Sequence, residues 1–209
     1  MLLLKWSFAT FIPLFAVIDP IAALPAFLAM TPQESEERRR EMAVRACAVA
    51  ACVLVLFALI GKHILSIFGI SLDSFRIAGG LILLLTALDN VQAKRGPIKE
   101  TPEEREAGLA KDDVSITPLA VPMLSGPGAI STVMVYRGQA DSFAQTALLC
   151  AVIAGVMAAS ALLFMVCLKG VNRVNPIVIK VVMRLTGLLI AATGVEFILT
   201  GLKNAGVAG

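Results

Sequence analysis

Apolar residues along this chain occur in long blocks separated by polar stretches, and the blocks predict membrane-spanning segments. A helix that crosses a bilayer needs about 20 apolar residues. Six blocks of that length follow one another, at 6–30, 42–68, 72–91, 115–136, 143–168 and 176–202. The longest polar stretch divides them into two sets of three and is rich in lysine, glutamate and proline, as is typical of a solvated loop. We therefore predict a three-span repeat at 1–91, a loop at 92–114 and a second three-span repeat at 115–209.

The two sets of segments also resemble each other in sequence, at a spacing of 107 or 108 residues. The matching stretches are Asp19-Pro20-Ile21-Ala22 with Gly126-Pro127-Gly128-Ala129, and 76–82 with 184–190. An odd number of spans in each repeat sends the second copy into the membrane from the opposite side. Proline lacks a backbone N–H and clashes with the preceding turn, so Pro20 and Pro127 should break their helices. The predicted fold class is an all-α integral membrane protein with six transmembrane segments in two inverted three-helix repeats, the first and fourth helices being broken.

Composition agrees with a membrane location. Apolar residues make up 58% of the chain, and mean hydropathy is +0.86, whereas a soluble domain is roughly 45–50% apolar even when glycine is counted. The net charge of +3 is small and is divided among several loops. Nucleic-acid binding needs a basic stripe on one face, so no nucleic-acid partner is expected. The expected surroundings are a lipid bilayer.

The distribution of lysine and arginine predicts the orientation, because these residues in short loops stay on the cytoplasmic side. Twelve lie in the loops after the first, third and fifth segments: Arg38, Arg39, Arg40, Arg45, Lys94, Arg95, Lys99, Arg105, Lys111, Lys169, Arg173 and Lys180. Five lie toward the opposite face: Lys5, Lys62, Arg76, Arg137 and Lys203. The 92–114 loop is therefore predicted to be cytoplasmic, and both termini of the multi-pass chain periplasmic or extracellular.

Several kinds of chemistry are not expected. The four cysteines lie inside apolar segments without Cys-x-x-Cys spacing, and His63 is the only histidine, so no metal site is predicted. No phosphate-binding loop of the Gly-x-x-x-x-Gly-Lys type and no nucleophile–base pair is visible. We therefore expect no enzyme and no cofactor. Energy for any transport would come from gradients or partners, with protons or sodium as candidate coupling ions.

The polar chemistry of the membrane segments gathers where the helices should break. Proline suits the first turn of a helix, so Pro20 and Pro127 can begin half-helices whose N–H groups and positive dipole ends face the gap. Two such ends suit a carboxylate, while Asp19 or unwound carbonyls suit an ammonium group. The pattern therefore favours a zwitterionic amino acid, and the abundant glycine and alanine favour a small side chain. The predicted substrate-binding residues are Asp19, Pro20, Ile21, Ala22, Ser125, Gly126, Pro127, Gly128, Ala129, Ser131 and Thr132.

Each of these features also has a purely structural interpretation. The prolines can simply kink spans and the small residues can simply pack helices. Asp19 can be an N-cap of the second half-helix rather than a substrate or proton site. Glu196, the other candidate coupling residue, lies near a segment end, where it can snorkel toward water. Arg76 and Arg184 occupy equivalent repeat positions near segment ends, so a shared structural role is expected for them.

Three stretches carry a family resemblance: FGISLDSFRIAGGLI at 68–82, PLAVPMLSGPGAIS at 118–131 and RLTGLLI at 184–190. They resemble the MarC family of bacterial inner-membrane proteins, over essentially the whole chain. The resemblance implies a bacterial inner-membrane location, six spans in two inverted halves and, from characterised members, transport of small neutral amino acids such as glycine and alanine. Members often carry asparagine before the first-helix proline, so a position that is neutral there is ionisable here, at Asp19.

Together these observations predict a secondary transporter of small neutral amino acids that works by alternating access around a midplane site between the broken helices. The alternative is a non-transporting structural or regulatory subunit of a membrane assembly. A homo-oligomer is compatible with either function.

Overall fold

The computed structural model describes residues 2–92, 115–169 and 176–206, and every regular element among them is a helix. In chain order these are α1 (Leu2–Ile18), α2 (Pro20–Met30), α3 (Glu36–Ile67), α4 (Leu72–Val91), the π-helix η1 (Ser115–Leu124), α6 (Pro127–Gly138), α7 (Phe143–Lys169) and α8 (Pro176–Asn204). Of the predicted 92–114 loop, residues 93–114 lie outside the described part. The predicted class, an all-α integral membrane protein, is confirmed, and the six-segment inverted repeat stays a prediction.

Within the described residues, five helical stretches are long and apolar enough to cross a bilayer. They are Trp6–Met30, Glu36–Ile67, Leu72–Val91, Phe143–Leu168 and Ile177–Asn204. The predicted fourth segment takes a different form, because η1 and α6 are only 10 and 12 residues long. A span needs about 20 helical residues, so neither helix could cross a bilayer alone.

Side-chain caps explain where two of the long helices begin. Ser35 precedes α3 and its Oγ accepts a hydrogen bond from the Arg38 N–H at 3.2 Å. Ser71 precedes α4 and accepts one from the Ser74 N–H at 3.0 Å. Serine is favoured at this position because its oxygen satisfies a first-turn N–H that has no partner within the helix.

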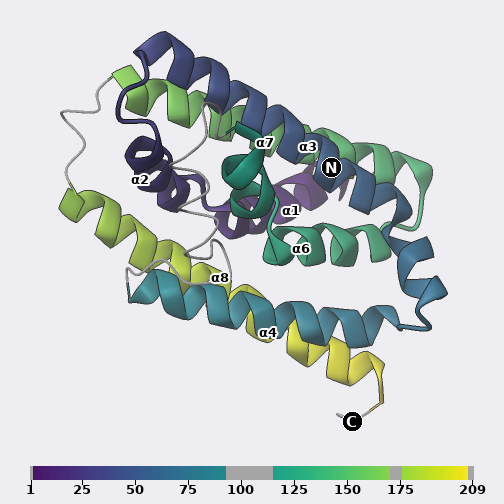
Figure 1. Ribbon diagram of the computed structural model, residues 1–209. Helices are drawn as coiled ribbons and strands as arrows, with labels where there is room; N and C mark the ends of the chain where they lie inside the picture. The colour runs from purple at the N-terminus through teal and green to yellow at the C-terminus, as the bar shows by residue number, and fades with distance from the viewer. Residues whose placement is uncertain (1, 93–114, 170–175, 207–209) are drawn as a thin grey trace.

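The helices pair across the two halves of the sequence. In Figure 1, α3 and α7 lie side by side along one edge of the molecule, α4 and α8 along the opposite edge, and α1, α2 and α6 lie between them. The α4–α8 pair is close because two glycines meet: a Cβ added to Gly80 would lie 2.6 Å from the carbonyl oxygen of Gly194. Small residues allow helix backbones to approach in this way. The interrupted elements are thereby enclosed between two long helix pairs.

The outer surface is strongly apolar. Large exposed side chains follow the outward faces of α4 and α8: Leu81, Leu85, Leu88, Leu185, Leu188 and Leu189. Contiguous apolar surface of this extent is typical of contact with a membrane. Buried polar side chains, among them Asp19, Asn90, Ser125 and Thr132, lie inside.

Candidate functional site

One residue, Asp19, separates α1 from α2. Its backbone is left-handed, with φ 49° and ψ 62°, and among the described residues it is the only non-glycine with positive φ. Pro20 disfavours the right-handed helical region for the residue before it. Aspartate and asparagine tolerate the left-handed region better than other side chains. The backbone N–H of Asp19 still donates to Phe15 O at 3.0 Å, so the chain turns sharply without opening a long unwound stretch.

The Asp19 side chain is buried, and two of its hydrogen bonds differ in reach. One oxygen accepts from the Ala22 N–H at 3.3 Å and caps α2. The other accepts from the Asn90 side-chain amide near the end of α4. The hydrogen bond expected if Asp19 caps α2 is therefore present in the structure. A role of Asp19 in transport stays a prediction. Asn90 is a site residue that the sequence did not predict, because no local motif marks a partner 71 positions away.

The second interruption, between η1 and α6, consists of Ser125 and Gly126. Gly126 is the N-cap residue of α6 and provides no side-chain cap. The first turn of α6 therefore lacks the carboxylate that Asp19 supplies to α2. Since the first N–H groups of a helix have no intrahelical partner, this end is suited to an anion.

The predicted hydroxyl ligands of the second half are all buried, and each donates to a nearby backbone carbonyl. Ser125 Oγ donates to Ala120 O at 2.9 Å. Ser131 Oγ and Thr132 Oγ1 both donate to Gly128 O, at 3.0 and 2.8 Å. Ser131 packs against α4, because a Cβ on Gly79 would lie 2.8 Å from the Cβ of Ser131. In this conformation the hydroxyl hydrogens are committed to backbone carbonyls.

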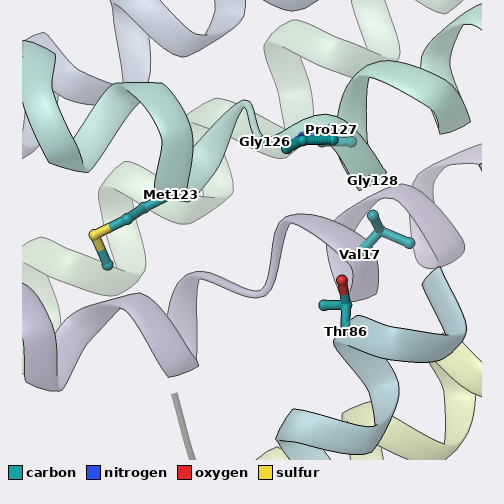
Figure 2. Close-up of a pocket in the computed structure, with 7 residues that line it drawn as sticks. Val17, Thr86, Met123, Gly126, Pro127 and Gly128 are labelled. Atoms are coloured by element: carbon teal, nitrogen blue, oxygen red, sulfur yellow. The ribbon is translucent and has the colours of Figure 1, made fainter. Parts of the chain in front are cut away.

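A small pocket opens at the uncapped end of α6. Figure 2 shows Val17 of α1 and Thr86 of α4 facing the Gly126–Gly128 stretch, with Met123 of η1 further away. Its free volume is about 10 Å³, close to the minimum that one water molecule needs. Glycine and alanine are several times larger, so the pocket is closed to them in this state.

The pocket unites only part of the predicted substrate site. Gly126, Pro127, Gly128 and Ala129 line it, together with Val17, Thr86 and Met123, which the sequence did not predict. The predicted residues that do not line it are Asp19, Pro20, Ile21, Ala22, Ser125, Ser131 and Thr132. Val17 lies two residues before Asp19, so the first interruption borders the pocket through α1.

The other predicted residues lie elsewhere. Glu196 is exposed on α8 and accepts a hydrogen bond from Thr200 Oγ1 at 3.2 Å. Arg76 is buried, and its Nη1 lies 3.8 Å from Asp73 Oδ1, whereas Arg184 is exposed. The two arginines thus occupy equivalent sequence positions in different environments. Their predicted structural role and the coupling role of Glu196 stay predictions.

These features define a class: a multi-pass helical integral membrane protein with a small pocket where its two halves meet. Residues 4–205 match the model of the MarC family integral membrane proteins, and the chain belongs to this family. It is 34% identical over 205 residues to the UPF0056 membrane protein YhcE of Escherichia coli, covering 94% of this chain and 92% of that protein. It is 32% identical over 205 residues to the UPF0056 membrane protein MJ1677 of Methanocaldococcus jannaschii, with 97% and 98% covered. No solved structure matches the chain.

Proposed function

We propose that this protein is a secondary transporter of small neutral amino acids, with its substrate site at the N-terminus of α6. The observation that carries the proposal is the uncapped first turn of α6, which borders a pocket shared by helices of both halves. A substrate carboxylate placed there would receive the N–H groups that no side chain caps. The small residues of the pocket wall favour a substrate with a hydrogen or methyl side chain.

The matched spacing of the helices in the two halves supports alternating access between inverted repeats. Pro127 begins α6 107 residues after Pro20 begins α2, and Phe143 begins α7 107 residues after Glu36 begins α3. Equivalent helices also pack on each other, α3 on α7 and α4 on α8. A pseudo-two-fold relation between halves allows one arrangement to open to either side in turn. The closed pocket fits an occluded state of such a cycle.

The ammonium group of the substrate needs an acceptor, and the carboxylate of Asp19 is the predicted one. In the present state its carboxylate is occupied by the Ala22 N–H and by Asn90. We infer that Asp19 changes partners when the pocket opens, which would couple substrate binding to movement of α2 against α4. Protons or sodium are the candidate coupling ions, with Asp19 and Glu196 as the residues to test.

Uptake of labelled glycine and alanine into liposomes containing the purified protein tests the function. Gly128→Ala is the informative variant, since its Cβ would lie 3.1 Å from Leu83 Cδ2 and 3.6 Å from Val17 Cγ1, inside the pocket wall. We expect it to fold and to take up alanine several times more slowly than the wild type. Gly155→Ala is the matched control, because its Cβ meets only Phe11 Cε2, at an ordinary 3.7 Å.

The alternative function makes the opposite prediction. A structural or regulatory subunit would give no uptake above empty liposomes for any small neutral amino acid. Equal uptake by Gly128→Ala and wild type would leave transport standing but would remove the site from this pocket.

A further inference from the structure

A second hollow lies at the other end of α6, in the turn that leads to α7. It is an open cleft with a free volume of about 400 Å³, lined by Leu59 of α3 and by Arg137, Asp141, Phe143 and Thr146 among others. In the same measure the central pocket has about 10 Å³. The cleft is thus large enough for an amino acid in the state where the central pocket is not.

The two halves differ at this turn. In the first half the corresponding turn is closed by Arg39, whose Nε and Nη2 donate to the carbonyl oxygen of Thr31 at 2.8 and 2.5 Å. The residue 107 positions later is Thr146, whose short side chain donates to Ser142 O at 3.2 Å. The serine caps Ser35 and Ser142 stand at this same spacing and each accepts from the N–H three residues on. The long side chain that fills the first turn therefore has no counterpart in the second.

The cleft carries two opposite charges that do not neutralise each other. Arg137 Nη1 donates to Ala140 O at 3.4 Å, while its buried Nε has no hydrogen-bond partner among the described residues. Within the same part of the chain, the exposed Asp141 carboxylate has neither a hydrogen bond nor an ion pair with Arg137. The guanidinium nitrogens and the carboxylate oxygens are therefore more than 4 Å apart.

We propose that this cleft is a second binding site for a zwitterionic amino acid, with the carboxylate on Arg137 and the ammonium group on Asp141. The ligand class rests on the proposed function. In transport, the cleft would be a docking position for the substrate on the face opposite the arginine-rich loops. The planar guanidinium group suits a carboxylate, and it retains donors after bonding Ala140. Leu59 and Phe143 provide an apolar wall for a small side chain.

Binding of glycine and alanine to the purified protein in nanodiscs, measured by calorimetry, tests this site separately from transport. Arg137→Gln and Asp141→Asn should each weaken alanine binding about tenfold, the usual loss for a charged hydrogen bond. Thr146→Arg should abolish binding at the cleft, because it places a long side chain there like the Arg39 side chain of the first-half turn. Arg38→Gln, which removes an arginine paired with Glu41 on the surface of α3, is the control and should bind like wild type.

Acetate and methylammonium, which each carry one of the two charges, complete the test. Both should bind more weakly than alanine if the cleft holds both ends of a zwitterion. Acetate binding as tightly as alanine would overturn the proposal, as would unchanged alanine binding in Asp141→Asn, a substitution at an exposed position. If Arg137→Gln and Asp141→Asn lose alanine binding but the wild-type protein shows no uptake into liposomes, the cleft is supported and transport is rejected. If the wild-type protein shows uptake but these two variants bind alanine unchanged, transport is supported and the cleft is rejected.

Discussion

Asp19 stands at a position that few residue types could occupy. The residue before Pro20 adopts a left-handed backbone, is buried, and must cap α2. Asparagine meets all three requirements, since it tolerates positive φ and keeps an acceptor oxygen. Alanine can be buried, but it disfavours positive φ and has no oxygen to cap α2. The two substitutions therefore separate what the carboxylate does as a cap from what it does as a charge.

For Asp19→Asn we expect folding like wild type, measured as the thermal unfolding midpoint in one detergent. Asp19→Ala should lose about 0.5–2 kcal/mol of stability from the cap alone. If Asp19 carries the coupling charge, uptake by Asp19→Asn will no longer respond to an imposed proton gradient. An unchanged response in that variant would leave Asp19 as a cap and direct the coupling question to Glu196.

At the scale of elements, two of the proline-containing segments behave differently although their sequences match. Pro20 follows a single left-handed residue, and α1 and α2 together remain long enough for one candidate span. Pro127 follows Ser125 and Gly126, and the helix before it is of the π type. The sequence predicted a break at each proline, because proline cannot continue a helix's hydrogen bonds, and broken transmembrane helices stay a prediction. It did not predict the π-helix, whose wider turn depends on what packs around it.

The α4–α8 pair gives an element-scale prediction. Gly80→Ala places a Cβ 2.6 Å from the carbonyl oxygen of Gly194, a backbone atom that can move only if the helices separate. We expect a loss of about 1–3 kcal/mol, as for other overpacked positions, seen as a lowered thermal unfolding midpoint. Gly155→Ala again serves as the control. If both variants had the same unfolding midpoint, the contact between α4 and α8 would be looser than described.

At the scale of the whole molecule, the orientation in the bilayer is the property most open to direct test. Ser35 and Ser142 are matched positions, each exposed and each capping a long helix of its own half. Inverted halves would place them on opposite faces, with Ser35 beside the arginines that predict the cytoplasmic side.

In a background without the native cysteines, Ser142→Cys should react with an impermeant thiol reagent added to intact cells, and Ser35→Cys should react only after lysis. Labelling of both variants from outside would contradict the inverted arrangement. Labelling of Ser35→Cys alone would reverse the predicted orientation while keeping the halves opposed.

The sequence by itself determined the membrane class, the positions of the long helices and the family, since these depend on hydropathy and on short stretches of matching sequence. It also offered a cap as one of two interpretations of Asp19, and the hydrogen bond of that interpretation, between residues three apart, is present. Only the tertiary structure brought Asn90 to Asp19, Val17 and Thr86 to the end of α6, and Arg137 to an open cleft beside Asp141. Contacts of this kind follow from how helices distant in the sequence pack together, and no short-range pattern encodes that packing.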